Sequence, residues 1–283
     1  MIVCKELDKT FGNKKELFKA LKANKSDIIA VKKAKIQKSS DKNVGVSCKK
    51  LDVSKFDTTI KGLFDSDDSY YLAVNTTGVL DSHDDLHKVG IWDRTVRDQQ
   101  GKNYLVTDHK MEMANVVVKK DNIKMFLATI PFSSIGKSYE GNTQALIYQF
   151  DKANIINDLA KEWLESGDDI EASVRMQYVK IELAMNSTSK DDVEEFKAYT
   201  DNIDAIANKD DFDEIDYFWV VTEAKNIGES SLVLRGSNGA TGILDNKNIQ
   251  PSEDTDKTEP SNDTQKQVTS KEQNDVINFY KNL

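Results

Sequence analysis

The sequence has few cysteines, histidines and prolines, and each shortage narrows the class of protein. Its 283 residues include two cysteines, three histidines and three prolines. Two thiols, Cys4 and Cys48, are too few for the disulfide framework of a small secreted domain, which favours a reducing cytoplasm. They also lack the spacing of a zinc site, so any metal centre would depend on His83, His87 and His109. His83 and His87 lie in a polar loop without a helical period or a nearby third ligand, which disfavours a metal site.

Long apolar runs are missing as well. No apolar stretch approaches the ~20 residues that a membrane-spanning helix needs. Residues 1–4 lead directly into charged side chains, which is not the pattern of a signal peptide. With 31% charged and 38% hydrophobic residues, the composition is typical of a soluble globular core with polar extensions.

Charged residues are abundant but unevenly distributed. The formal net charge is −9, yet residues 1–50 contain 14 lysines against five acidic residues. Such a basic head can bind nucleic acid or an acidic protein surface, and it can equally be a solvated lysine-rich helix. Because these lysines are not interleaved with aromatic residues and arginines, direct recognition of nucleic acid is disfavoured.

Composition divides the chain into three parts. Residues 1–66 are predicted to form a basic, partly helical N-terminal extension, with an amphipathic helix at 14–24 and a second segment capped by Ser26. Residues 67–245 carry the strand patterns and form the core. Residues 246–283 are predicted to be a disordered linker with a short apolar terminal segment, which is either a tethered docking peptide or a frayed end.

The core pattern is mainly β with flanking helices, which is the α+β class. Strands are predicted at 70–74, 103–108, 114–119, 124–130, 144–150, 170–181, 215–222 and 225–234. A helix is predicted over 151–166, where Gly167 ends it. The acidic insertion, defined as residues 182–216, contains 12 acidic residues and three lysines. Helical pieces near 190–199 and 201–207 fit its pattern, and a solvated loop is a simpler interpretation of it than a binding device.

Two polar residues stand where strands could present them for nucleophilic catalysis. Ser173 lies in an alternating strand, where Ile170 and Ala172 would face the core and Ser173 the opposite side. A serine hydroxyl attacks efficiently only when an imidazole removes its proton and an acid orients that imidazole. His109 follows the apolar strand at 104–108 and is the candidate base. Taken singly, such a serine or histidine is more often structural than catalytic.

Four local patterns together resemble the prohead maturation proteases of tailed bacteriophages, whose fold is shared with herpesvirus assemblins. The resemblance covers residues 67–245. The patterns are a Gly/Asp-rich turn ended by an aromatic residue (77–92), the strand before the histidine (104–109), a helix, glycine stop and strand (163–173), and a terminal strand with a Glu-x-Ser-Leu-Val signature (222–233). Residues 113–117 replace the Pro-Ile-Gly-like step that family members often show, and 238–240 lack the proline of the family's closing segment.

The resemblance implies a serine endopeptidase with a triad of His109, Ser173 and Glu229. Glu223 is the alternative acid, and Arg175 is a candidate helper at the oxyanion because of its place beside the nucleophile. The implied fold is a herpesvirus-protease-like β-barrel core with a helical N-terminal extension and a disordered C-terminal tail. No metal and no organic cofactor is implied.

By the same resemblance, the substrates are the scaffold and the major capsid protein of the phage, with self-cleavage left open. The expected location is the assembling prohead in the infected host cytoplasm. Contact with the portal and self-association stay open, and a membrane partner is not expected. The alternatives are a catalytically silent structural protein of the phage head with the same fold, and a nucleic-acid-binding protein that uses residues 1–50.

Overall fold

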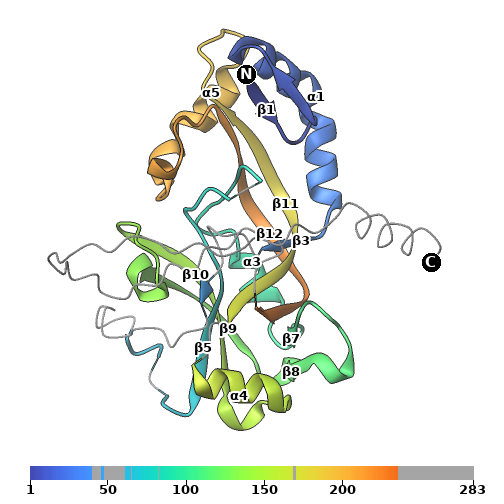
Figure 1. The fold of residues 1–283 in the computed structure, drawn as a ribbon, viewed down its shortest axis with the longest axis vertical. Helices are drawn as coiled ribbons and strands as arrows, with labels where there is room; N and C mark the ends of the chain where they lie inside the picture. The colour runs from blue at the N-terminus through green and yellow to red at the C-terminus, as the bar shows by residue number, and fades with distance from the viewer. Residues whose placement is uncertain (40–45, 48–60, 65, 82, 168–169, 235–283) are drawn as a thin grey trace, which may run out of the picture. The chain divides into compact units, whose positions relative to one another are not determined.

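The computed structural model describes residues 1–39, 46–47, 61–64, 66–81, 83–167 and 170–234 (Figure 1). The predicted linker and terminal segment at 246–283 lie outside the described residues, so their disorder stays a prediction. Within the described part of the chain, no helix is long and apolar enough to cross a membrane.

The described residues form four helices and three β-sheets, which confirms the α+β class. The helices are α1 (Lys14–Ala34), α3 (Asp93–Asp98), α4 (Asp158–Ser166) and α5 (Val193–Thr200). A two-stranded sheet pairs β1 (Ile2–Cys4) with β2 (Lys9–Phe11), and a three-stranded sheet has the order β5 (Ser69–Thr76), β10 (Asn142–Asp151), β9 (Lys124–Pro131). Single 3₁₀ turns occur at Met113–Asn115, Lys120–Asn122, Phe132–Ile135, Lys152–Asn154, Ile203–Ala205 and Lys209–Asp211.

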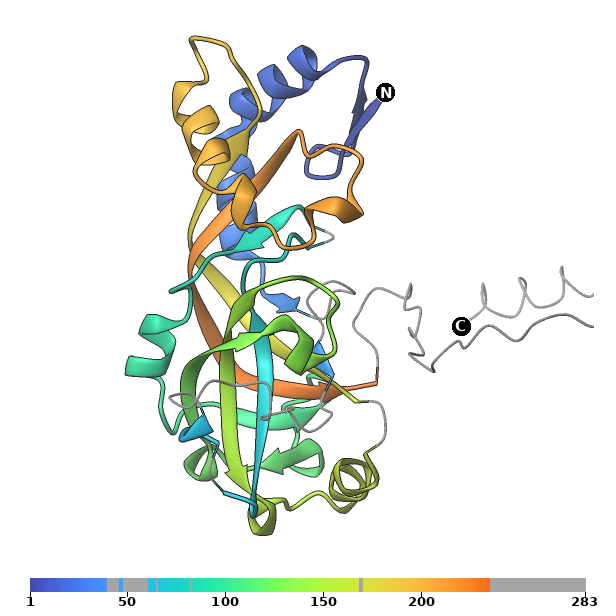
Figure 2. The ribbon, with the colours of Figure 1, turned by 90° about the vertical axis from the view of Figure 1, so that its left-hand side faces the viewer.

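The central sheet is mixed and carries the candidate site. Its order is β3 (Gln37–Ser39), β11 (Glu171–Met185), β12 (Tyr217–Val233), β7 (Tyr104–Thr107), β8 (Val116–Val118). Two short strands join it: β4 (Val46–Ser47) pairs with β11, and β6 (Asp85–His87) pairs with β12. The predicted closed β-barrel is not found among the described residues, because no strand pairing joins the central sheet to the three-stranded sheet (Figure 2).

The long antiparallel pair β11 and β12 forms the middle of this sheet. Ile170, Ala172 and Val174 belong to the main hydrophobic core. Because successive side chains of a strand point to opposite faces, Ser173 projects to the other side of the sheet, as its alternating pattern predicts. The two strands predicted within 215–234 are one strand, since the chain continues through a bulge near Gly228 instead of turning.

Helix α1 is one continuous helix, and the predicted interruption at Ser26 is wrong. The Asn13 side chain caps its first turn by accepting a backbone N–H. Leu17, Leu21 and Ile28 are buried on one face and belong to the main core. Their helical spacing continues through Ser26, so the apolar stripe holds the helix together past the polar residues that resemble a second cap.

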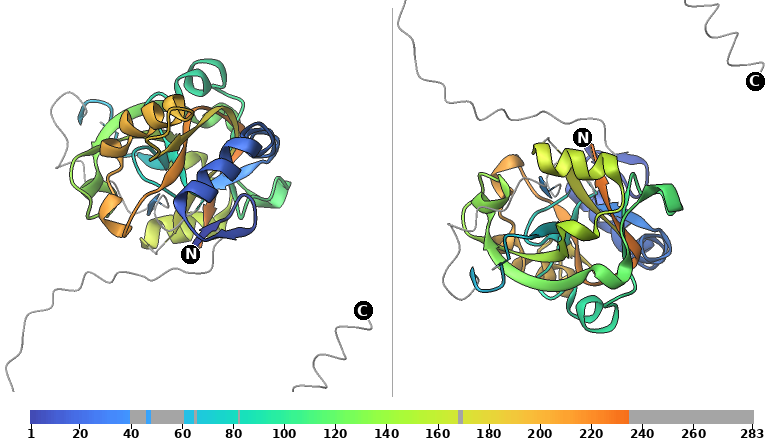
Figure 3. Two further views of the ribbon diagram at one scale, coloured as in Figure 1. Left: turned by 90° about the horizontal axis from the view of Figure 1, so that it is seen from above. Right: turned by 90° about the horizontal axis from the view of Figure 1, so that it is seen from below.

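The acidic insertion also has a fixed structure, and its interpretation as a solvated loop is wrong. It contains α5, and its apolar residues Ala198, Ile206 and Ile215 form a core cluster with Phe218 of β12. Seen along the long axis, α5 and α1 lie beside each other at one end of β11 (Figure 3). The insertion is therefore a packed part of the fold.

Lysines of α1 pair with acidic residues of this insertion. The ion pairs between them include Lys14 with Asp216 at 2.8 Å, Lys22 with Asp192 at 3.0 Å, and Lys25 with Glu195 at 2.6 Å. The basic head thus has an acidic partner within its own chain. Its positive charge can be explained without nucleic acid or a second protein.

Candidate active site

The candidate nucleophile, Ser173, lies near the start of β11. Its partner across the pair with β12 is Ser231, and the partner of Ser231 on β7 is Val106. The three residues form a row across neighbouring strands, and residues paired in this way project to the same face of a sheet. The residues that directly follow β7 therefore lie close to the side chain of Ser173.

The candidate base, His109, lies in a tight turn directly after β7. Asp108 and His109 both have left-handed backbone conformations, with φ of 52° and 55°. Few residues other than glycine adopt this conformation. Two hydrogen bonds to β12 hold the turn: Asp108 N donates to Leu232 O at 3.0 Å, and His109 N donates to Ser231 Oγ at 2.9 Å. The turn brings the imidazole back across β12 toward Ser173.

The candidate acid, Glu229, is positioned by an irregularity in β12. The pairing of β11 with β12 shifts register around Gly228, which has φ of 79°. A bulge of this kind bends a strand and re-aims the neighbouring side chain. Glu229 is completely buried, and within the described residues its Oε2 atom has no hydrogen-bond partner. Its Oε1 atom faces His109.

Together the three side chains form a hydrogen-bonded chain. His109 Nδ1 lies 2.9 Å from Glu229 Oε1, and His109 Nε2 lies 2.7 Å from Ser173 Oγ. An ionised carboxylate only accepts hydrogen bonds, so Nδ1 carries the proton that is donated to Glu229. In the neutral imidazole, Nε2 is then the acceptor for the Ser173 hydroxyl. This arrangement is the one that a general base needs in order to remove a serine proton.

The chain of hydrogen bonds is shielded from solvent. Ser173 and Glu229 are 0% exposed, and the side chain of His109 is 6% exposed. Charges interact more strongly in such a low-dielectric environment than in water. A positive charge that forms on the imidazole during proton transfer is therefore strongly stabilised by Glu229.

A second polar network supports β12 behind the acid. Asn226 Nδ2 donates to Tyr148 OH at 2.6 Å and to Ser230 Oγ at 3.2 Å. All three residues are buried, and burial raises the pKa of Tyr148, so its hydroxyl remains protonated. The network fixes β12 on both sides of the bulge at Gly228.

Two other residues named by the sequence do not join the triad. Glu223, the alternative acid, pairs at the surface with Lys180 at 2.8 Å and Arg94 at 3.2 Å, and the hydrogen bond from Lys180 lowers its pKa. Within the described residues, Glu229 is the carboxylate that binds the imidazole. Arg175 is half-buried on β11, two residues after the serine.

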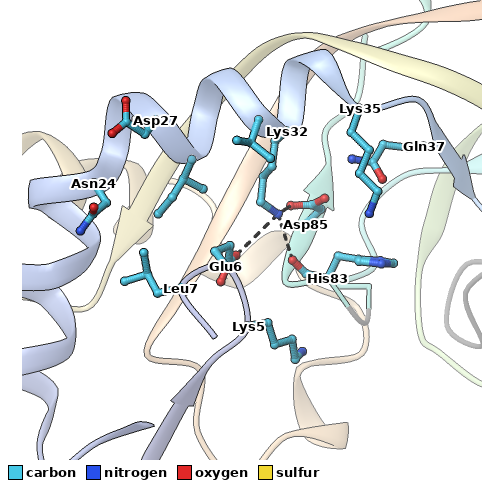
Figure 4. A pocket seen from close by; sticks show the side chains of 12 residues that line it. Lys5, Glu6, Leu7, Asn24, Asp27, Lys32, Lys35, Gln37, His83 and Asp85 are labelled. Carbon is cyan, nitrogen blue, oxygen red and sulfur yellow. Dashed lines mark hydrogen bonds and ion pairs between the residues drawn. The ribbon is translucent and has the colours of Figure 1, made fainter. Parts of the chain in front are cut away.

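The remaining histidines lie apart from this site. His87 is buried, with Nε2 3.2 Å from Tyr178 OH, and His83 is exposed. Among the residues that the structure describes, no group of three or more metal-ligating side chains occurs. A cavity of about 400 Å³ lies beside His83, between α1 and β6, and no triad residue lines it (Figure 4).

Ser231 is the serine of the Glu-x-Ser-Leu-Val signature, but the sequence pattern gave it no role in the site. It is completely buried, and its Oγ atom accepts the N–H of His109 while donating to Val106 O or Leu232 O. It stands two residues after the acid, on the same face of β12. That spacing was the available signal, but its meaning depends on the left-handed turn after β7.

Comparisons with known proteins give no match: no protein-family model, no curated protein and no solved structure corresponds to this chain. The candidate site therefore stands on its own geometry.

Proposed function

We propose that the chain is a serine endopeptidase in which Ser173, His109 and Glu229 form the catalytic triad. Ser173 Oγ attacks the scissile carbonyl carbon while His109 Nε2 takes the hydroxyl proton. The tetrahedral intermediate collapses as the imidazolium gives that proton to the leaving amine, which produces an acyl-enzyme. Water, deprotonated by the same imidazole, then hydrolyses the ester and restores Ser173. Glu229 stabilises the imidazolium in both halves of the reaction.

The observation that supports this proposal best is the continuous hydrogen-bonded chain from Glu229 through His109 to Ser173. Its members come from three segments that are far apart in the sequence. A buried carboxylate with one unpartnered oxygen costs stability, so a purely structural explanation of the cluster is weak. A serine, an imidazole and an acid in this order define a nucleophile with its base and orienting group.

The resemblance to prohead maturation proteases supports a narrower proposal. The core would be herpesvirus-protease-like, the substrates would be the phage scaffold and major capsid protein, and the site of action would be the assembling prohead. Portal contact, self-association and self-cleavage belong to the same proposal. Nucleic acid is less favoured, because the lysines of α1 have acidic partners within the chain.

A fluorophosphonate probe tests the chemistry directly, because it phosphonylates serines that a neighbouring base activates. We expect one adduct on Ser173 by mass spectrometry, none on the Ser173→Ala variant and a severe loss with His109→Ala. When the scaffold and capsid proteins of the same phage are co-expressed, cleaved products should appear with the native chain and not with either variant. A folded chain that forms no adduct under any condition would refute the proposal.

The second candidate function is a catalytically silent structural protein of the phage head. One observation favours it: the proposed nucleophile has no exposed surface. A silent protein would give neither an adduct nor cleaved capsid protein, so the same two experiments separate the candidates.

A further inference from the structure

The strand that carries the candidate nucleophile has no open edge at Ser173. One side of β11 is paired with β12. On the other side, Val46 of β4 pairs antiparallel with Ala172, and Ser39 of β3 pairs antiparallel with Val174. Ser173 therefore lies between two contacts made by an N-terminal segment of its own chain, and it is 0% exposed.

A peptide substrate would need this edge. An extended peptide binds a sheet by adding a strand to its edge, where main-chain hydrogen bonds supply affinity. Its scissile carbonyl must also come within about 3–3.5 Å of the Ser173 Oγ atom for attack. A serine without exposed surface cannot meet that requirement until the chain around it moves.

We propose that β3 and β4 are an intramolecular mask, which occupies the place of the substrate on β11 and keeps the protease latent. This inference rests on the proposed function. The mask has the geometry of a bound peptide, because both strands run antiparallel to β11 on either side of the nucleophile. Binding of the substrate and binding of the mask then compete for one edge of β11.

Helix α1 anchors the mask, since β3 follows it directly. Lys32 in the last turn of α1 is buried and pairs with Asp85 at 2.5 Å and Glu6 at 3.6 Å (Figure 4). From β11, Gln177 Nε2 donates to Lys33 O at 3.0 Å. Breaking a buried ion pair leaves an uncompensated charge, which is strongly unfavourable. The end of α1 is thereby fixed on β11. The strands beyond it, β3 and β4, can be displaced by a substrate strand.

The masking strands are short enough to be displaced. β3 has three residues and β4 has two, so each contributes few backbone hydrogen bonds. Segments with few contacts open at a small fraction of the global unfolding free energy. Their covalent attachment to α1 compensates, because a short tether gives an effective concentration in the millimolar range. A weak mask can therefore suppress the reaction and still yield to a substrate.

Paired proline and alanine variants of the full chain test the mask. Lys38→Pro combined with Val46→Pro removes a backbone N–H from each strand and disfavours the pairing. Lys38→Ala combined with Val46→Ala changes the same side chains but keeps both N–H groups. Fluorophosphonate labelling of Ser173 is followed by mass spectrometry. We expect the proline pair to react roughly tenfold faster than the native chain, because local opening no longer limits access, and the alanine pair to react at the native rate.

A reversible disulfide gives the opposite test, and it does not depend on the proline pair folding. Ser47 and Glu171 are partners across β4 and β11. Ser47→Cys with Glu171→Cys, in a Cys48→Ser background, should fix β4 in place when oxidised. We expect the oxidised chain to lose labelling of Ser173 and dithiothreitol to restore it.

Different outcomes separate the mask from the proposed function. Equal labelling of the native, proline and alanine chains, or of the oxidised and reduced chains, would overturn the mask and leave the protease intact. A serine that stays unlabelled even in the folded proline pair would overturn the proposed function and the mask with it.

Discussion

At the scale of single residues, the candidate site depends on backbone conformations that most side chains avoid. The backbone of His109 is left-handed, and so is that of Gly228, the residue before Glu229. A residue other than glycine is strained in this conformation, and such strain is held in place by surrounding structure and is concentrated at functional sites. Here the surrounding structure is β12, which binds the turn of His109 through Ser231 and carries Glu229 after its bulge.

The triad residues should behave as a unit. We expect Ser173→Ala and His109→Ala each to abolish peptide turnover, and the double variant to be little worse than either, because neither residue works without the other. Glu229→Gln should lose less, since the acid orients the base without transferring the proton. Steady-state kinetics on one peptide substrate measures all four chains. If the two alanine effects simply multiplied, the residues would have independent roles.

Ser231 should position the base. Ser231→Ala removes the acceptor of the His109 N–H, and we expect roughly tenfold slower fluorophosphonate labelling from an imidazole misplaced at a cost of about 1.4 kcal/mol in the barrier. Ser230→Ala is the matched control, because it removes a buried hydroxyl on the opposite face of the same strand. That control should lower the unfolding free energy by ~1 kcal/mol and slow labelling less than Ser231→Ala does, because the Ser230 hydroxyl binds Asn226 and makes no contact with the turn of His109. Equal labelling by both variants would contradict the positioning role.

Gly228 should matter for geometry beyond its effect on stability. A Cβ atom at Gly228 or at Gly136 would meet no atom within 4 Å, and both residues have left-handed backbones. Either glycine-to-alanine change should therefore cost about 1–2 kcal/mol of unfolding free energy from backbone strain alone. Gly228→Ala should in addition slow labelling of Ser173, because it displaces Glu229. Urea unfolding and labelling rates, measured on both variants, distinguish strain at the site from strain elsewhere.

At the scale of elements, local patterns predicted most strands and helices, and the failures have physical reasons. The strands at 70–74, 124–130 and 144–150 were readable because β-branched and aromatic runs end at turn residues. The helix predicted over 151–166 begins only at Asp158, where Asn157 provides the cap. The acidic insertion was misjudged because its partners, the lysines of α1, are about 170 residues away in the sequence. Pairing over such a separation leaves no local signal.

The pairing of α1 with the insertion should make stability depend on acid pH. Burial alone would raise the pKa of Glu195, but Lys25 and Lys22 outweigh burial and hold that pKa below its ordinary value. A carboxyl group of this kind stabilises the fold above its unfolded pKa of about 4.3, and the contribution disappears as pH falls through the folded pKa. We therefore expect the unfolding free energy to decline below about pH 4.5.

Removing the charge of Lys25 tests whether its pairing with Glu195 causes this decline in unfolding free energy. Lys25→Ala should flatten the fall in unfolding free energy between about pH 5 and pH 3, because Glu195 then titrates nearer its unfolded value. Lys197→Ala is the control, since its partner Asp201 is an exposed i,i+4 neighbour directly after α5. Urea titrations followed by tryptophan fluorescence at several pH values give the curves. Parallel curves for native and Lys25→Ala chains would show that the pair does not contribute.

At the scale of the whole molecule, the residues of the site could be named from the sequence but their surroundings could not. His109, Ser173 and Glu229 each end or occupy a strand, and their order along the chain carried the prediction. The open central sheet and the pairing of β3 and β4 with β11 depend on contacts between distant segments, which periodicity does not encode. The role of Ser231 was missed for the same reason, since that role exists only once β7 lies beside β12.

Residues 246–283 should not be needed for cleavage of a peptide. All three triad residues precede residue 234, so deletion of 246–283 should leave cleavage of a short peptide unchanged. Under the proposed function, packaging of the chain into proheads should fall, because the predicted tether with its apolar end raises local concentration without touching the site. Peptide turnover and the protease content of purified proheads are the two measurements. If peptide turnover fell together with packaging, the boundary near residue 245 would be wrong.

The two ends of the β11–β12 pair differ in how much their sequence can change without affecting the candidate site. Ser173 pairs with Ser231 near one end, whereas Met185 pairs with Tyr217 beside the acidic insertion. At ~3.3 Å per residue, the stretch from Ser173 to Met185 spans roughly 40 Å. The length of the insertion at the far end can therefore be changed without moving the candidate site. The same separation makes the insertion a natural place to graft a foreign domain, or to divide the protein into two fragments that reassemble.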